Sequence, residues 1–261
     1  MKHYGKIFVF AIMTAAAVWG AGCSGSANDV GTFLQMSIRE AQAGKDSNAL
    51  MLAKEACMVS PDNVEALIMR ALMAERCNDK TLALDSALQA VRLAPDNFAA
   101  LYTVGRLYSC NKDTAAEAAG YLEKAHKIKG DDINTLILLA NLSVFLKSDK
   151  ALGYLLKIES LDSSIIDTFE GKTMLGHAYM LRGDKRRATI NFGFADKRAK
   201  SVLSNYNYAV AIDCLYNKPA LAASKYQVFL KQSADDPAFA SLRKNVEKRV
   251  RKIKPARSRR R

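Results

Sequence analysis

Large apolar residues alternate with small ones between residues 169 and 202. The large residues are Leu175, Tyr179 and Phe192, and the small ones are Gly176, Ala188 and Ala195. This spacing predicts two antiparallel helices in close contact, because small residues allow the approach and large ones fill the space between the helices. Gly183 and Asp184 stand at the turn, where glycine ends one helix and aspartate caps the next.

The same pattern recurs with a period of 34 residues. Residues 30–63 and 64–97 match without a gap, and both end in a proline, Pro61 or Pro95, followed by Asp and Asn. Proline ends a helix and Asn then caps the next one. Weaker copies occupy 98–132, 133–164 and 203–236, and residues 169–202 form the fifth. Ile158 and Phe229 stand where a small residue is expected, and 165–168 predicts irregular stacking.

These copies resemble the tetratricopeptide repeat (TPR), a helix-turn-helix unit of about 34 residues. The resemblance implies an all-α fold: a right-handed superhelix, or α-solenoid, of about six repeats over residues 30–236. Residues 237–254 follow with an apolar helical face and a basic opposite face. Because an array needs a polar outer surface at its end, we expect a capping helix there.

The N-terminus has the pattern of a targeting segment. Lys2 and Lys6 precede an apolar run over 7–18 that is short for a membrane span, and small residues then lead to Cys23. Residues 1–22 resemble a bacterial lipoprotein signal, which implies lipidation of Cys23 and a tether over 23–29. Gly20 departs from that pattern, and an uncleaved anchor or ordinary secretion are the alternatives. By resemblance to enterobacterial lipoproteins, in which an aspartate after the cysteine implies retention at the inner membrane, Ser24 implies the outer membrane.

The formal charge of +13 comes from the C-terminus. Residues 243–261 contain eleven Lys or Arg and one Glu, and 255–261 is expected to be a basic disordered tail containing Arg257, Arg259, Arg260 and Arg261. Such a tail can bind anionic lipid, another envelope polyanion or an acidic partner. Nucleic acid is not expected, since an exported protein seldom meets it. A solvated tail without a ligand is the alternative.

Catalytic and metal-binding patterns are not found. His126 and His177 lack partners at metal-ligand spacing, and no phosphate loop or nucleophile elbow is present. Beyond Cys23, the cysteines are far apart and are expected to be buried, unpaired thiols: Cys57, Cys77, Cys110 and Cys214. We therefore predict a protein that is not an enzyme and that holds no metal or cofactor.

The resemblance implies a protein or peptide partner in a concave groove lined by the first helix of each repeat. The predicted groove residues are Leu34, Ile38, Glu65, Ile68, Leu72, Tyr102, Arg106, Ile137, Asn141, Val144, His177, Met180 and Asn207, with Ala211 at a further groove position. Leu34 and Ile38 replace the Lys and Asn with which some relatives grip a carboxylate. An amphipathic helix or an extended apolar segment is the expected ligand. Alternatively, the neighbouring turn or the tether covers these residues.

Six repeats behind a lipoprotein signal resemble the pilotin lipoproteins that help assemble pilus or secretion channels. The resemblance implies a non-catalytic scaffold at the bacterial outer membrane, facing the periplasm. Adaptors for peptidoglycan enzymes or for outer-membrane protein assembly are alternatives. An enzyme or enzyme-activating module is an alternative of another class, and would need a site completed by a partner at His177 or Asp213.

Overall fold

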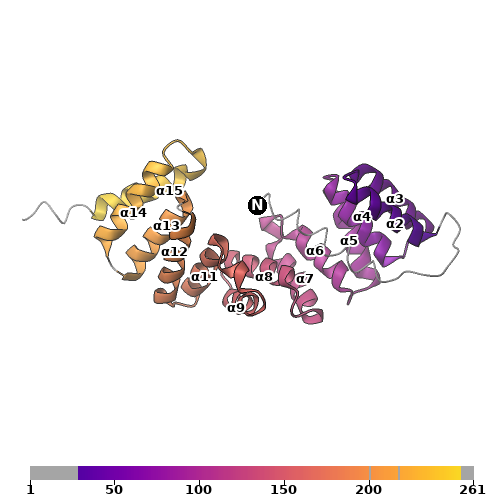
Figure 1. The fold of residues 1–261 in the computed structure, drawn as a ribbon, viewed down its shortest axis with the longest axis horizontal. Coiled ribbons are helices and arrows are strands. Elements are labelled where there is room, and N and C mark those ends of the chain that lie inside the picture. Colours follow the sequence, from indigo (N-terminus) through magenta and orange to yellow (C-terminus); the bar gives the residue numbers. More distant parts are fainter. Residues whose placement is uncertain (1–28, 200, 217, 254–261) are drawn as a thin grey trace, which may run out of the picture. The chain divides into compact units, whose positions relative to one another are not determined.

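The computed structural model describes residues 29–199, 201–216 and 218–253, and helices account for most of them (Figure 1). No strand occurs within these ranges. The α-helices are α2 (Val30–Gln42), α3 (Asp46–Val59), α4 (Val64–Arg76), α5 (Lys80–Leu93), α6 (Phe98–Tyr108), α7 (Ala115–Ile128), α8 (Ile133–Phe145), α9 (Ala151–Leu161), α10 (Ser163–Ile166), α11 (Phe169–Leu181), α12 (Lys185–Ala199), α13 (Val202–Tyr216), α14 (Pro219–Gln232) and α15 (Ala240–Ile253). Short 3-10 helices occupy Lys112–Thr114 and Pro237–Phe239.

Each of the six stretches that repeat in the sequence contains two long helices, so the predicted all-α array of helix-turn-helix repeats is confirmed. Two details differ from the expected spacing. The short helix α10 lies between the fourth and fifth pairs, and α13 begins at Val202, one residue before the expected repeat. Among the described residues, no helix is both long and apolar enough to span a bilayer.

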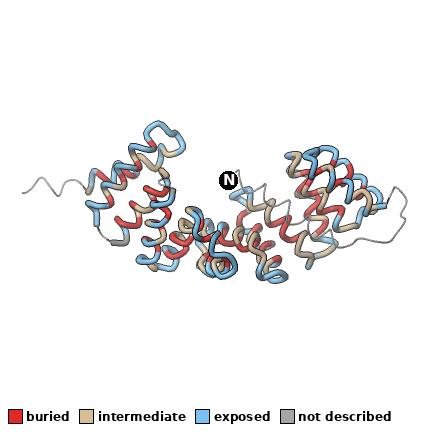
Figure 2. Tube along the Cα trace, in the orientation of Figure 1, coloured by how far each residue is buried: buried red, intermediate tan, exposed pale blue. Residues whose placement is uncertain are grey.

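The chain divides into two compact units, Met1–Asn111 (unit 1) and Lys112–Arg261 (unit 2). The division falls inside the third repeat, beside the 3-10 helix Lys112–Thr114. This repeat, 98–132, is one residue longer than the 34-residue period. In the described part of each unit, buried positions recur along the helices and the connecting loops are largely exposed (Figure 2).

Side chains predicted to cap helices do so. The Asn63 side chain accepts a hydrogen bond of 2.8 Å from the Ala66 amide, and Asn97 accepts one of 3.0 Å from Ala100. Gly183 adopts a φ of 75° at the end of α11, in the left-handed region that favours glycine. Asp184 then accepts from the Arg187 amide at 2.9 Å. These residues at the helix ends therefore determine where the helices begin and end.

Unit 1 packs its helices through alanine. One core cluster brings together Ala56, Ala66, Ala90 and Ala100 with Leu67, and all five are almost fully buried. Alanine at these contacts lets helix axes approach closely and carries no side-chain entropy cost.

Unit 2 uses larger residues. Phe192 fills the space beside Gly176, where an added Cβ would lie 2.7 Å from the phenyl ring. Ile158 and Phe229, which occupy expected small-residue positions, are fully buried in two core clusters. At the irregular junction, a Cβ on Gly171 would lie 2.6 Å from the Ile165 carbonyl oxygen. Glycine is therefore required where α11 meets α10.

The last helix, α15, packs on α14. Val246 and Val250 are buried in the same cluster as Phe229, so the apolar face predicted for 237–254 is turned to the core. Arg249 fastens this helix through a bidentate contact with the buried carboxylate of Asp213, at 2.7 and 2.8 Å. The end of the array is closed by apolar packing and by one ion pair.

Candidate partner-binding surfaces

The predicted groove residues of unit 1 belong largely to its core. Leu34 and Leu72 pack against the cluster that contains Ile68, Ile38 is partly buried, and Glu65 is exposed. The expectation that Ile68 and Tyr102 are exposed is wrong, since only 7% of Ile68 and 3% of Tyr102 is accessible.

Tyr102 stacks on Phe98 at a ring-centroid distance of 5.9 Å, one helical turn earlier in α6. The Tyr102 side chain is therefore buried although it stands at a predicted groove position. Its position in the repeat therefore does not determine its exposure.

Arg106 makes contacts within unit 1. Its two terminal nitrogens donate to the two carboxylate oxygens of Glu75, and the Arg106 Nη1 to Glu75 Oε1 distance is 2.6 Å. Burial opposes the charged guanidinium, but the hydrogen bonds and charge of Glu75 outweigh it and raise the pKa of Arg106. This bidentate pair joins α4 to α6, so the guanidinium fork is already occupied.

Two of the predicted groove residues in unit 2, Asn141 and Met180, are exposed, whereas only Glu65 is exposed among those in the described part of unit 1. Ile137 and Val144 are partly buried against the core, Asn141 is exposed, and Met180 is 37% accessible. The expectation of exposure is wrong for Asn207, which is 8% accessible, and for Ala211, which is fully buried. Both lie on α13, which packs between α12 and α14.

Position counting missed several exposed apolar residues on the first helices, among them Phe145 at the end of α8 and Leu181 at the end of α11. Because α8 contacts α11, we define the first-helix surface by residues from these two helices. It comprises Asn141, Val144, Phe145, His177, Met180 and Leu181.

The side chains of His177 and Asp213 make contacts within the fold. The His177 imidazole meets the Phe192 ring edge-on at a centroid distance of 5.0 Å, and burial lowers its pKa. Hydrogen bonding to Arg249 and then Tyr226 lowers the pKa of Asp213 against the opposing effect of its burial. Both carboxylate oxygens of Asp213 accept hydrogen bonds from Arg249. Asp213 thus holds the end of the array together.

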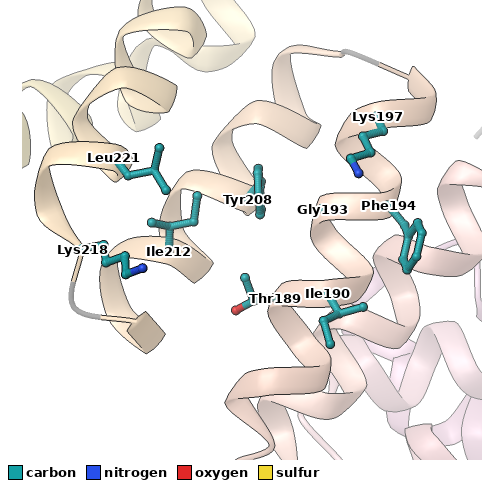
Figure 3. Close-up of a pocket in the computed structure, with 9 residues that line it drawn as sticks. All are labelled: Thr189, Ile190, Gly193, Phe194, Lys197, Tyr208, Ile212, Lys218 and Leu221. Atoms are coloured by element: carbon teal, nitrogen blue, oxygen red, sulfur yellow. The ribbon is translucent and has the colours of Figure 1, made fainter.

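A cleft of about 350 Å³ opens between α12, α13 and the start of α14 (Figure 3). Its lining residues are Thr189, Ile190, Gly193, Phe194, Lys197, Tyr208, Ile212, Lys218 and Leu221. None of these is a predicted groove residue. The sequence signal that could have identified the cleft is Ile190 and Phe194, which occur at helical spacing between Arg186 and Lys197. Apolar residues on an otherwise basic helix face indicate a contact surface.

A second hollow of about 320 Å³ lies among α7, α8 and α9. His126, Tyr154 and Lys150 are among its lining residues. The His126 and Tyr154 rings meet edge-on, with a centroid distance of 5.7 Å. Burial raises the pKa of Tyr154. Lys150 forms an ion pair with Glu123 at 2.7 Å.

The four cysteines within the described ranges are free. Burial raises the pKa of Cys57, as expected for a small apolar-like thiol. The expectation of burial is wrong for Cys110 and Cys214, which are exposed. No group of three or more His, Cys, Asp or Glu side chains that could hold a metal occurs among the described residues. Cys23 and the tail arginines, Arg257, Arg259, Arg260 and Arg261, lie outside the described part of the chain.

No protein-family profile and no curated protein matches this sequence. Solved structures do match in fold. YrrB, described as a TPR protein with an unusual peptide-binding site, has a TM-score of 0.62 at 20% identity, over 75% of this chain and 97% of that one. The pilF protein of Pseudomonas aeruginosa has a TM-score of 0.60 at 14% identity, over 83% and 97%. MamA has a TM-score of 0.56 at 18% identity, over 66% and 92%.

These likenesses agree with the helix pairs described above. The chain has the fold of a tetratricopeptide-repeat array.

Proposed function

We propose that this protein is a non-catalytic scaffold, anchored through Cys23 at the bacterial outer membrane, that binds another protein in the periplasm. The observation that carries the proposal is the first-helix surface of unit 2. There Phe145, Met180 and Leu181 are exposed apolar residues on neighbouring helices of a repeat array. Exposed apolar residues grouped in this way suit the apolar face of a partner segment.

The envelope location rests on the sequence. Basic residues, a short apolar run and small residues precede Cys23, which is the order found in lipoprotein signals. Assembly of a multiprotein envelope complex, such as a pilus or secretion channel, is the role that we favour. The fold likeness to the pilF protein supports the same choice. An adaptor for peptidoglycan enzymes or for outer-membrane protein assembly would use the same surface.

In-cell photo-crosslinking tests the surface. A photoreactive residue at Phe145 or at Met180 should trap the same envelope protein, because the two positions lie on neighbouring helices. The same residue at Lys54, exposed on α3, is the matched control and should not trap it. Absence of capture from both test positions, in a folded and membrane-bound protein, would contradict the proposal.

The anchor has a separate test. Cys23→Ser should abolish incorporation of labelled palmitate and move the protein from the membrane fraction to the soluble fraction. Cys110→Ser is the control, since Cys110 is an exposed free thiol within the repeats. Retention of Cys23→Ser in the membrane fraction would show that another segment anchors the chain.

The basic tail contributes by charge in this proposal. Deleting 257–261 removes four arginines and should weaken association with anionic membranes at low salt, by about 1 kcal/mol for each basic residue near the surface. Co-sedimentation with anionic vesicles at low and high salt measures this. An unchanged salt profile would exclude the tail from the interaction.

A further inference from the structure

The cleft between α12, α13 and α14 has an unusual apolar rim. Ile190 and Phe194 on α12 are 46% and 49% exposed, and Leu221 on α14 is 49% exposed. All three line the same cleft. In Figure 3, Leu221 lies across the cleft from α12, while Ile190 and Phe194 project from the side of α12 that faces away from Tyr208. Gly193 forms part of the floor; a Cβ there would lie 3.3 Å from the Tyr208 ring. Three large apolar side chains thus remain in water at the edge of one hollow.

The unpaired charges on the three helices that form this cleft are positive. Helices α12, α13 and α14 contain two carboxylates, Asp196 and Asp213, and both are buried. Lys225 binds Asp196 at 2.6 Å, and Arg249 binds Asp213. No free carboxylate on these helices therefore offsets the cations around the cleft.

Three cations near the cleft have no charged or hydrogen-bonding partner in the described part of the chain. Lys197 and Lys218 line the cleft, and Arg186 lies one turn before Ile190 on α12. Within the described residues, none of these three side chains makes an ion pair or hydrogen bond. The neighbouring Arg187, in contrast, contacts Asp184 at 3.4 Å and lies over the Tyr179 ring. Three cations without a partner among the described residues therefore lie on the same helices as the exposed apolar residues, two of them in the cleft itself.

We propose that this cleft is a docking site for an acidic amphipathic segment of a partner protein. Its apolar side chains would pack on Ile190, Phe194 and Leu221, and its carboxylates would meet Lys197 and Lys218. The site shares no residue with the first-helix surface, so it adds a second site to the proposed protein-binding function. Charge complementarity selects an acidic partner, and the exposed apolar rim selects a segment with an apolar face.

A random 16-residue peptide library, displayed and selected on the full chain, tests the chemistry without assuming a partner. Peptides recovered on the wild-type chain should be enriched in Asp and Glu together with Leu, Ile and Phe. The enrichment in acidic residues should disappear in a parallel selection on Lys197→Glu/Lys218→Glu. The matched control, Lys231→Glu/Lys248→Glu, makes the same charge change at exposed positions outside the cleft and should retain the enrichment.

A synthetic peptide with the recovered consensus then gives affinities by fluorescence anisotropy. We expect at least about a tenfold weaker binding for Lys197→Glu/Lys218→Glu, and a similar loss for Phe194→Ser, whose side chain is half exposed and not needed for the core. Binding that is equal in these variants and the control would overturn the proposal, as would selection of peptides without acidic residues.

The experiment also separates this site from the function proposed above. If Met180→Asp abolishes peptide binding and Phe194→Ser leaves it unchanged, the first-helix surface binds protein and the cleft does not. If the cleft lysines instead govern binding to anionic phosphatidylglycerol vesicles and not to peptides, the occupant is a lipid surface and the proposal fails.

Discussion

Units 1 and 2 share one repeat pattern but differ in packing and charge. Residues 29–111 contain 8 Lys or Arg against 10 Asp or Glu, whereas residues 112–253 contain 24 against 16. Among the described residues of unit 1, Tyr102 is the buried aromatic residue; unit 2 buries Tyr179, Phe192, Tyr226 and Phe229. In unit 2, a large side chain such as Phe192 packs directly against a glycine, Gly176. In unit 1, alanines form the equivalent contacts between helices.

Both proposed binding surfaces lie in unit 2. The short helix α10 interrupts the regular stack, and Ile190, Phe194 and Leu221 remain exposed at the cleft between α12, α13 and α14. Excess cations remain beside them. In unit 1, the groove positions are used for packing, as at Ile68, or for an internal ion pair, as at Arg106.

The largest expected effect is at the junction in unit 2. Gly171→Ala should cost about 3 kcal/mol, because a Cβ would meet backbone atoms of Ile165 and Ile166 at 2.6 Å. Gly120→Ala, a helical glycine with open space around it, should stabilise by up to about 1 kcal/mol. Chemical denaturation measures both effects.

Hydrogen exchange shows where the Gly171→Ala effect falls. Repeats interact mainly with their neighbours, so the loss of protection should concentrate around α10 and α11 and spare unit 1. An equal loss of protection in both units would contradict this separation.

The second effect compares two ion pairs. Arg249→Met leaves the buried Asp213 carboxylate without its cation, at a cost of about 2 kcal/mol, because a buried charge is costly but Arg249 itself is half exposed. Arg106→Met in unit 1 should cost about 1 kcal/mol, since Glu75 is accessible enough to be hydrated. Equal losses of unfolding free energy would show that burial of the carboxylate does not distinguish the pairs.

The third effect should be the same in both units. Asn97→Ala in unit 1 and Thr168→Ala in unit 2 each remove a side chain that accepts from a first-turn amide, at 3.0 Å in both cases. Each should cost about 1 kcal/mol of unfolding free energy. Asp62→Ala, next to a cap but without that hydrogen bond, should cost less than about 0.5 kcal/mol. A loss at Asp62 that matches the other two would point to charge and not to capping.

The smallest effect depends on pH. Burial lowers the pKa of His177 below the value of about 6.5 expected in the unfolded chain. The unfolded chain therefore binds more protons in this interval, and stability is complete above pH 6.5 and falls as the pH drops through the lowered pKa. Hydrogen exchange at pH 7.5 and 5.5, corrected for intrinsic rates, should show unit 2 losing protection.

Residues 29–111 contain no histidine, so unit 1 provides an internal control for this measurement. His177→Gln should remove the loss of protection between pH 7.5 and 5.5. Persistence of the loss in that variant would assign it to another group.

The surfaces were less predictable than the helices. Counting positions within the repeat placed Met180 correctly on an exposed face, yet it also placed Tyr102 and Asn207 there, and both are buried. Exposure depends on what packs around each side chain: Tyr102 stacks on Phe98 of its own helix, and α13, which carries Asn207, packs between two helices. The residues of the cleft come from three helices, and no local pattern relates Leu221 to Phe194.

The sequence alone determined the helices, their pairing and their ends, because apolar period, small-residue contacts and caps such as Asn63 and Gly183 act over a few residues. Only the tertiary structure decided which side chains are accessible to a partner and which charges are already neutralised. Lys197 and Lys225 are both lysines near one apolar surface, but Lys225 is paired with Asp196. Such pairing depends on contacts between residues that are distant in sequence, and local periodicity carries no information about it.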